Sequence, residues 1–188
     1  MSQIASLIEF WRNEIGPKGW YAGSSDIDDA ITKRYRSLWD EAADGGLGHW
    51  LTDAEGAYAY LLLTDQFPRN MFRNDARSFL LDPNARAAAK LAMDQGWDMQ
   101  IDEPERQFFY LPLMHSENLV DQDRCMACFK DRMPKMGADN LRHAAAHRWI
   151  IKRYGRFPYR NEALGRETTS EEAEFIRRGG YATVLDAA

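Results

Sequence analysis

The sequence has no long run of uncharged hydrophobic residues, and its acidic side chains outnumber its basic ones. No segment approaches the roughly eighteen apolar residues of a membrane-spanning helix, so we expect no membrane partner. With 24 Lys and Arg against 29 Asp and Glu, the formal net charge is −5. Nucleic-acid binding usually needs a basic face and is therefore not expected. The amino-terminal stretch also lacks the basic start and apolar core that are typical of a secretory signal.

Cysteine is scarce, and both residues of this type, Cys125 and Cys128, fall within a helical pattern. One C-x-x-C pair cannot complete a structural zinc site, and no βαβ pattern indicates a thioredoxin-like context. Buried, reduced thiols are the simplest interpretation, and they favour a cytoplasmic location. A glycine-rich phosphate-binding loop is also missing, because the glycines stand at predicted helix ends. We therefore expect no cofactor.

What the chain does contain is typical of a helical globular protein. Its 188 residues are 45% hydrophobic and 28% charged, which suffices for one well-filled core. Apolar side chains recur at the three- to four-residue spacing of helices, whereas the alternating runs of strands are missing. Short connections favour antiparallel neighbouring helices. The sequence predicts an all-α fold in a single domain over residues 1–188.

Capping residues and glycines predict where the helices begin and end. The predicted helical segments are 2–14, 25–44 capped by Ser25, 53–66 capped by Thr52 or Asp53, 82–96, 103–114, 117–133 capped by Ser116, 140–154 closed by Gly155, and a last one within "TTSEEAEFIRRGG". The segment 53–66 is apolar almost all round, which is typical of a buried helix.

Two similar strings follow helical segments, "TDQFPRN" at 64–70 and "YGRFPYRN" at 154–161. Because proline disfavours helical geometry in the residue before it, each Phe-Pro is predicted to mark a helix end. Each motif would then place an Arg and an Asn beyond a helix C-terminus. There the unpaired carbonyls favour a cation, and Asn tolerates left-handed geometry. A helix-stop role of this kind is one explanation of both motifs.

Two observations favour a ligand instead. Asp65 continues the apolar stripe of its helix, and a buried carboxylate needs a partner, for which Arg153 and Arg156 are candidates. Residues 141–166 hold seven basic side chains against Glu162 alone, so this segment carries +6 and the remainder of the chain −11. Such a cluster attracts an anionic ligand or an internal acidic partner. Arginine suits the bidentate recognition of carboxylate or phosphate.

The strings "LLLTDQFPRN", "ERQFFYLPLMHSEN", "GRFPYRN" and "LGRETTSEEAEF" resemble the bacterial domain-of-unknown-function family 924. The likeness spans almost the whole chain and implies a tetratricopeptide-like architecture of packed helix pairs, with no particular activity. By position it covers Asp65, Gln66, Phe67, Pro68, Arg69, Asn70, His115, Ser116, Glu117, Gly155, Arg156, Phe157, Pro158, Arg160 and Asn161. Tyr159 stands where the family usually has His, and tyrosine is a poor base near neutral pH.

Histidines near the motifs are further candidate site residues. In "HSE" at 115–117, Ser116 as an N-cap and Glu117 in the first turn account for two of the three residues, which leaves His115 to line a site. His143 and His147 share a helix face, but zinc needs three or four ligands and the Glu of an H-E-x-x-H motif is missing. We therefore expect no metal. His147 stays a candidate, because its helix leads into the second motif.

Together these patterns predict a basic pocket, built from both motifs, that binds a small carboxylate or phosphate. The predicted ligand-binding residues are Asp65, Gln66, Arg69, Asn70, His115, Glu117, His147, Arg153, Arg156, Arg160 and Asn161. We assign no catalytic residue, although His115, Glu117 and His147 are the acid–base candidates for any reaction. Two alternatives stay open: a tetratricopeptide-like module that grips an acidic peptide or a C-terminal carboxylate, and purely structural Asp–Arg pairing. The sequence does not indicate an oligomeric state.

Overall fold

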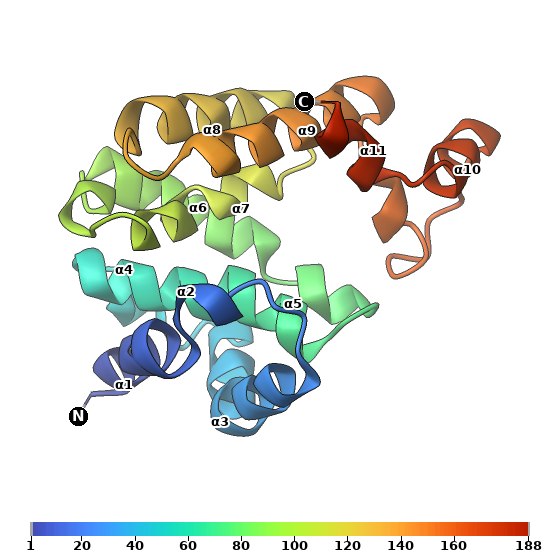
Figure 1. The fold of residues 1–188 in the computed structure, drawn as a ribbon. Coiled ribbons are helices and arrows are strands. Elements are labelled where there is room, and N and C mark those ends of the chain that lie inside the picture. Colours follow the sequence, from blue (N-terminus) through green and yellow to red (C-terminus); the bar gives the residue numbers. More distant parts are fainter. Residues whose placement is uncertain (1, 188) are drawn as a thin grey trace. The chain divides into compact units, whose positions relative to one another are not determined.

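The structure is a computed structural model, and it describes residues 2–187. These residues form helices and no β-strand, which confirms the predicted all-α fold (Figure 1). The chain divides into two compact units, which are described separately below. Unit 1 spans Met1–Arg73 and Arg77–Ile101, and unit 2 spans Asn74–Ala76 and Asp102–Ala188. The single domain and the tetratricopeptide-like arrangement stay predictions.

Unit 1 is built around one short, buried helix. Its α-helices are α1 (Gln3–Glu9), α2 (Gly16–Gly19), α3 (Ser25–Ala43), α4 (Ala54–Leu61), α5 (Phe67–Met71) and α6 (Asp82–Asp94). Two π-helical turns, η1 (Phe10–Ile15) and η3 (Leu62–Gln66), follow α1 and α4 directly. Helix α4 packs against α1 and α6, while α3 packs against α5 (Figure 1).

Apart from Glu55 in its first turn, the segment containing α4 is buried on all sides, as predicted. Its N-cap is Asp53, whose carboxylate accepts a 2.8 Å hydrogen bond from the backbone N–H of Gly56. Tyr58 and Leu62 have no exposed surface. A helix that is apolar all round can be stable only when its neighbours cover every face.

The first Phe-Pro does not end its helix, contrary to the prediction. Helix α4 continues through the π-helical turn η3 into α5, where Pro68 lies in the first turn. Proline lacks an N–H and clashes with the carbonyl four residues earlier. A π-helical turn accommodates both defects, because its hydrogen bonds run five residues back instead of four. Arg69 and Asn70 consequently lie within α5 and not beyond a C-terminus.

Unit 2 contains α7 (Leu111–Met114), α8 (Leu119–Arg132), α9 (Ala138–Tyr154), α10 (Ser170–Arg177) and α11 (Tyr181–Asp186). Helices α8 and α9 pack side by side, and α11 packs against α9 (Figure 1). The buried side chains of Ile150, Ile151, Phe157 and Phe175 form a cluster that joins α9 to α10, and Tyr181 and Val184 of α11 pack against it. The sequence did not predict α11.

The second motif does end its helix, as predicted. Helix α9 stops at Tyr154, and Gly155 takes the left-handed conformation with φ 71° while its N–H donates to the carbonyl of Ile151. Phe157 is extended, as expected for a residue before proline. Neither motif places its Asn in left-handed geometry. Among residues 2–187, the non-glycine residue with positive φ is Asn74.

One predicted N-cap is wrong. Helix α8 begins at Leu119, and the cap is Asn118, whose side chain accepts a hydrogen bond from the N–H of Val120. The hydroxyl of Ser116 instead donates to Asp121 at 2.7 Å. Asp121 is buried. A hydrogen bond to a carboxylate is stronger than one between neutral groups, so the Ser116 hydroxyl bonds Asp121 instead of capping the helix.

The N-caps of α3 and α10 differ: the cap of α3 makes no side-chain hydrogen bond, whereas the cap of α10 does. Helix α3 begins at Ser25 itself, so the N-cap is Ser24, which makes no side-chain cap bond. Helix α10, the last predicted helix, begins with a capping box: Thr169 accepts from the N–H of Glu172, whose carboxylate accepts from the N–H of Thr169.

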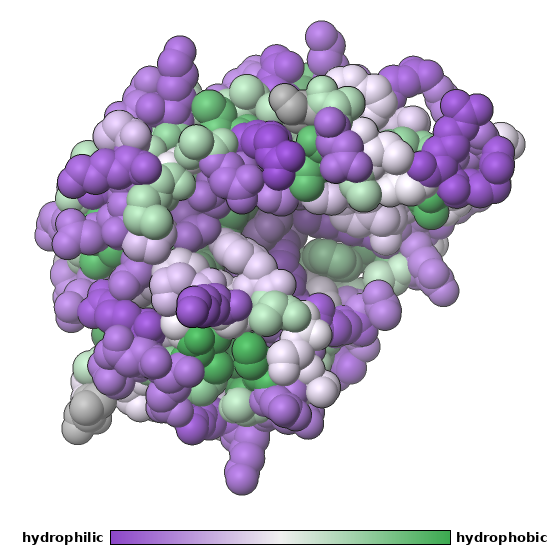
Figure 2. Space-filling view, in the orientation of Figure 1, coloured by the Kyte–Doolittle hydropathy of each residue, from purple (hydrophilic) through white to green (hydrophobic). Residues whose placement is uncertain are grey.

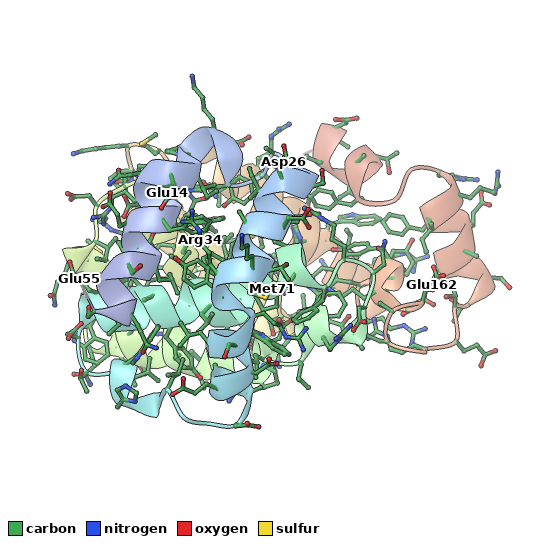
Figure 3. All side chains as sticks on the ribbon, turned by 90° about the horizontal axis from the view of Figure 1, so that it is seen from below. Glu14, Asp26, Arg34, Glu55, Met71 and Glu162 are labelled. Atoms are coloured by element: carbon green, nitrogen blue, oxygen red, sulfur yellow. The ribbon has the colours of Figure 1, made fainter. Side chains whose placement is uncertain are left out.

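No helix within residues 2–187 is long and apolar enough to cross a membrane. Hydrophilic side chains cover most of the face seen in Figure 2. Some of them pair at the surface, as Glu14 of η1 and Arg34 of α3 do, with Nη1 and Oε2 2.8 Å apart (Figure 3).

Replacing Asp53 by Ala is predicted to lower the free energy of unfolding by about 1 kcal/mol, because α4 loses its N-cap bond. Asp53→Ser should retain most of the stability, since serine also caps. Thr52→Ala is the control, because Thr52 is exposed and makes no cap bond. Urea unfolding measures all three. Equal loss in Asp53→Ala and Asp53→Ser would contradict a capping role.

Candidate functional site

Three of the predicted residues line one pocket in unit 1, which we call the first-motif pocket. Its volume is about 200 Å³, and it is lined by Trp20, Tyr21, Gly23, Gln66, Arg69, Asn70 and Arg73. The second motif belongs to unit 2. A pocket shared by both motifs therefore stays a prediction, and the surroundings of each motif are described in turn.

Behind the first-motif pocket, one guanidinium holds two carboxylates. Arg69 Nη2 donates to both carboxylate oxygens of Asp82 at 3.0 and 3.1 Å, and its Nη1 lies 3.3 Å from Asp65 Oδ1. Asp65 is 2% exposed and Asp82 6%. The burial predicted for Asp65 is confirmed. Its partner in unit 1 is Arg69, four residues later on the same helical run.

The proposed pairing of Asp65 with Arg153 or Arg156 is wrong. Arg153 pairs with Glu171, and Arg156 donates from Nε and Nη2 to the two carboxylate oxygens of Glu172. The prediction failed because it assumed that the helix ends at Pro68, which would have moved Arg69 away from Asp65. A continuous helix brings residues i and i+4 together.

A chain of hydrogen bonds orients the outer arginine of the pocket. Gln66 Nε2 donates to Asn70 Oδ1 at 3.3 Å, and Asn70 Nδ2 donates to Asp28 Oδ1 at 2.7 Å. Asp28 in turn accepts two hydrogen bonds from Arg73, one from Nε and one of 2.9 Å from Nη2. Gln66 and Asn70 therefore fix Asp28, and through it the plane of the Arg73 guanidinium.

Tyr21 also lines the pocket. Although the residue as a whole is 60% exposed, loss of hydration around its hydroxyl, together with the Asp65 carboxylate, raises the pKa of Tyr21. The hydroxyl therefore keeps its proton at neutral pH and can donate a hydrogen bond.

In unit 2, the second motif is tied to α10 through Glu172. Hydrogen bonds from Arg156 lower the pKa of Glu172 to about 2, despite the opposing effect of its burial. Asn161 is buried and donates to Thr168 at 3.3 Å and to Glu172 at 3.4 Å. Arg156 and Asn161 thus stabilise the link between α9 and α10.

Glu117 is held by a second ion pair. Arg166 Nη1 and Nη2 donate to its two carboxylate oxygens at 2.7 and 3.1 Å, and the N–H of Phe157 donates to Oε1 at 2.8 Å. Burial alone would raise the pKa of Glu117, but these bonds outweigh it and lower the pKa. Glu117 is therefore ionised at neutral pH and cannot serve as a general acid there.

The remaining predicted residues, His115, His147 and Arg160, gather around Phe157. The ring centroids of His147 and Phe157 are 5.4 Å apart, and those of His115 and His147 are 6.5 Å apart. The guanidinium carbon of Arg160 lies 4.5 Å from the Phe157 centroid. Unit 2 therefore brings two histidines and a buried arginine together.

Sequence reasoning missed Tyr21, Asp28, Arg73 and Arg166. Arg73 follows Arg69 by four residues, so the helical spacing could have suggested it once the helix was known to continue. Asp28 and Tyr21 precede the motif by about forty residues. Only the packing of α3 against α5 brings Asp28 to the pocket.

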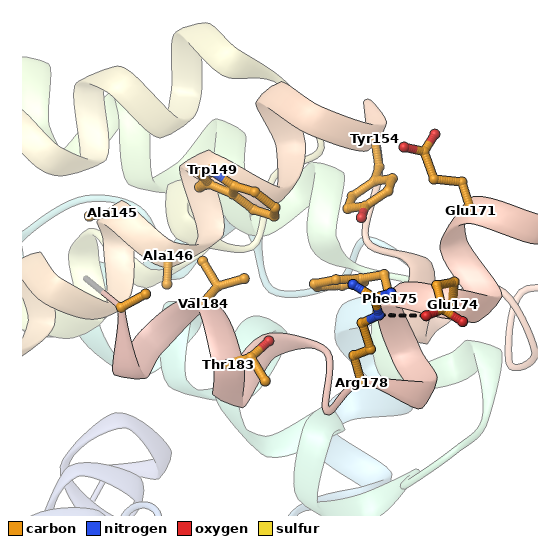
Figure 4. A pocket seen from close by; sticks show the side chains of 11 residues that line it. Ala145, Ala146, Trp149, Tyr154, Glu171, Glu174, Phe175, Arg178, Thr183 and Val184 are labelled. Atoms are coloured by element: carbon orange, nitrogen blue, oxygen red, sulfur yellow. Dashed lines mark hydrogen bonds and ion pairs between the residues drawn. The ribbon is translucent and has the colours of Figure 1, made fainter.

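A larger groove in unit 2 contains none of the predicted residues. Its volume is about 650 Å³, and Trp149, Tyr154, Phe175 and Val184 form its apolar walls (Figure 4). The charged side chains at its edge pair with neighbours, as Glu174 does with Arg178. The groove is therefore mainly apolar and differs in chemistry from the first-motif pocket.

The histidine and cysteine side chains in the described part of the chain do not form a metal site. Within residues 2–187, no group of three or more His, Cys, Asp or Glu side chains comes close enough to hold a metal ion. Cys125 and Cys128 are both buried thiols, and burial raises the pKa of Cys125. A thiol of that kind is a poor nucleophile at neutral pH.

Comparison with known proteins identifies the family. Residues 7–180 match the family described as bacterial protein of unknown function (DUF924). The chain belongs to this family. A solved structure of a protein of unknown function from Agrobacterium tumefaciens is similar to this chain, with 39% sequence identity and a TM-score of 0.86 over 93% of this chain and 97% of that chain. None of the curated proteins compared with the chain matches it. The predicted resemblance to the DUF924 family is thus confirmed.

Replacing Arg69 by Met in this DUF924 protein is predicted to lower the free energy of unfolding by about 3–5 kcal/mol, because two buried carboxylates lose their cation. Arg34→Met is the matched control, since the Arg34–Glu14 pair is half exposed and screened by solvent, so its loss should lower the stability far less. Urea unfolding at pH 7 compares them. Similar losses in both variants would contradict the account of the buried triad.

Glu172 is predicted to make unfolding depend on pH. Because its folded-state pKa lies below the value of 4.5 for a free side chain, its contribution is complete above pH 4.5 and disappears as the pH falls towards 2. Glu172→Gln should therefore be less stable than the natural protein at pH 7, on the order of 1–3 kcal/mol, with a smaller difference at pH 3. Exposed Glu162→Gln is the control. A difference that does not change with pH would rule out this linkage.

Proposed function

We propose that the protein binds a small anion, a carboxylate or a phosphate, in the first-motif pocket. The observation that carries the proposal is the position of Arg73. Its side chain is 49% exposed and lines the pocket, and Asp28 occupies Nε and Nη2. Among residues 2–187, no acceptor bonds its Nη1. A guanidinium held on one edge can offer its other edge to an anion.

The charges around the pocket predict how strong this binding is. Arg69 and Arg73 face three carboxylates, those of Asp28, Asp65 and Asp82. Long-range attraction of an anion is therefore weak, and binding relies on direct hydrogen bonds from Arg73. We expect a dissociation constant on the order of 1 mM, equivalent to about 4 kcal/mol.

The size of the pocket favours a small ligand over a peptide. A volume of about 200 Å³ is below the 300–1,000 Å³ of sites that enclose drug-sized molecules. An acidic peptide would need an extended groove lined with arginines. The proposed ligand is therefore a molecule of a few heavy atoms with one anionic group.

For the arginines that flank the second motif, internal pairing is the better proposal. Arg153 and Arg156 each pair with a glutamate of α10. Bidentate pairing with a buried carboxylate occupies the fork of Arg156. We propose that these two arginines hold α10 in place instead of contacting a ligand.

Calorimetric titration with acetate and with inorganic phosphate tests the anion proposal. Arg73→Ala should weaken binding of the preferred anion at least tenfold, which corresponds to about 1.4 kcal/mol, because the principal donor is removed. Arg34→Ala, which removes an equally exposed arginine of unit 1, should leave binding unchanged.

Three outcomes would count against the proposal. Binding that survives Arg73→Ala would place the anion elsewhere. Binding lost equally in Arg34→Ala would indicate a general effect of charge. Heat from an acidic peptide without heat from any small anion would favour the protein-interaction alternative.

A further inference from the structure

We propose that the apolar groove of unit 2 binds an aromatic carboxylate, a flat ring system that carries one negatively charged group. The rings of the ligand lie against Trp149, Tyr154 and Phe175, and its carboxylate binds Arg178. The inference goes beyond the first-motif pocket and does not depend on it, because the two sites share no residue. It rests on the volume of the groove, on its aromatic walls and on the hydrogen bonding of one arginine.

The groove is large enough for a molecule with one or two rings. It lies where α9 meets α10 and α11 (Figure 4). Ala145, Ala146 and Thr183 line part of it, and their small side chains leave space that larger ones would fill. The volume of about 650 Å³ falls within the 300–1,000 Å³ of sites that enclose small organic molecules.

Three aromatic side chains from two helices contact one another along the groove. The ring centroids of Tyr154 and Phe175 are 4.9 Å apart, and each of these rings lies 6.3 Å from Trp149. Aromatic rings prefer offset or edge-on contacts at centroid separations of about 4.5–7 Å. The ring of a ligand can extend this cluster at the same separations, which favours an aromatic ligand over a flexible acyl chain.

The outermost of these rings leaves apolar surface uncovered. Trp149 is 47% exposed, whereas Phe175 is 8% exposed. Single exposed apolar residues are common on protein surfaces, but Trp149 lines a groove together with other apolar side chains. A ligand that covers the indole removes this surface from water, which is the main favourable contribution to binding at an apolar site.

The charged groups at the edge of the groove favour an anion. Glu174 accepts hydrogen bonds from Arg177 and Arg178, and Glu171 pairs with Arg153. Three arginines thus face two glutamates, which leaves one positive charge in excess. An excess of one sign attracts ligands of the opposite sign and repels those of the same sign.

Arg178 keeps donors available for a ligand. Its Nε donates to Oε1 of Glu174, four residues earlier in the chain (Figure 4). No acceptor within residues 2–187 bonds its Nη1 or Nη2. Hydrogen bonds from Arg177 and Arg178 lower the pKa of Glu174, which therefore stays ionised at neutral pH and holds the Arg178 guanidinium in place. The two terminal nitrogens can donate in parallel to the two oxygens of a carboxylate.

A cationic ligand is the main alternative for a site with several aromatic walls. Aromatic rings bind quaternary ammonium groups through cation–π contacts. Here, however, the guanidinium carbon of Arg153 already lies 5.6 Å from the centroid of Tyr154. A second cation at the same wall would be repelled by Arg153 and by the excess positive charge at the edge.

The test uses the full chain with Arg73→Ala, so that the first-motif pocket cannot contribute. Calorimetric titration at pH 7 compares 2-naphthoate with 2-naphthamide, which has its shape without its charge, and with octanoate, which has its charge without its rings. Naphthoate should bind at least about fivefold more tightly than either. The absence of naphthoate binding, or a preference below about twofold in either comparison, would overturn the proposal.

Two neighbouring arginines provide a matched pair of variants. Arg177 and Arg178 both pair with Glu174, and their side chains are 73% and 74% exposed, but only Arg178 lines the groove. Arg178→Gln should reduce the preference for naphthoate over naphthamide to within about twofold, whereas Arg177→Gln should retain it. Equal losses in the two variants would indicate a general effect of charge and would contradict the assigned role of Arg178.

The indole N–H of Trp149 reports where the ligand binds. In a ¹⁵N-labelled protein, naphthoate should shift this resonance to saturation, with Trp149→Phe used to assign it. Trp97 of unit 1 is the reference and should not shift. An unchanged Trp149 resonance, or an equal shift at Trp97, would place the ligand outside the groove and overturn the proposal. Because Arg73 is absent throughout, failure of the first-motif pocket cannot produce any of these results.

Discussion

The structure of unit 1 depends on the need to neutralise two buried carboxylates with one guanidinium. Arg69 lies between Asp65 and Asp82 and donates to or approaches both, and a buried carboxylate needs such a partner. Arg69 reaches Asp65 as its i+4 neighbour, so the helix has to continue past Pro68. The π-helical turn η3 makes this continuation possible. The continuous helix also places Asn70 within hydrogen-bonding distance of Asp28. Asp28 in turn orients Arg73, which lines the first-motif pocket.

The two Phe-Pro motifs show how one local sequence takes two structures. Both contain a proline that disfavours a regular helix before it. In the second motif, Gly155 precedes the proline and adopts the left-handed conformation that ends α9. The first motif has no glycine at the corresponding place, and the chain relieves the clash by widening one turn. The residue three places before each proline, Asp65 or Gly155, thus separates a helix that continues from a helix that stops.

Much of the fold could be predicted from local patterns. The helical class, the burial of the α4 segment, the stop at Gly155 and the capping box at Thr169 follow from side-chain spacing and capping chemistry within a few residues. The π-helical turn was not predicted, because a proline by itself is compatible both with a helix end and with a helix that continues through a widened turn. In the candidate site, the burial of Asp65 was predictable, but the contribution of Asp28 depends on the packing of α3 against α5, which local patterns do not determine.

The central claim is that the buried triad and the Gln66–Asn70–Asp28 chain hold Arg73 ready to bind an anion. The most direct test follows the side-chain ¹⁵Nε resonances of arginine during titration with sodium phosphate at constant ionic strength. The account predicts a saturable shift at Arg73, with Arg69 unchanged because its guanidinium is committed to Asp65 and Asp82. A shift at Arg73 no larger than that of the surface residue Arg34, or a saturable shift at Arg69, would contradict it.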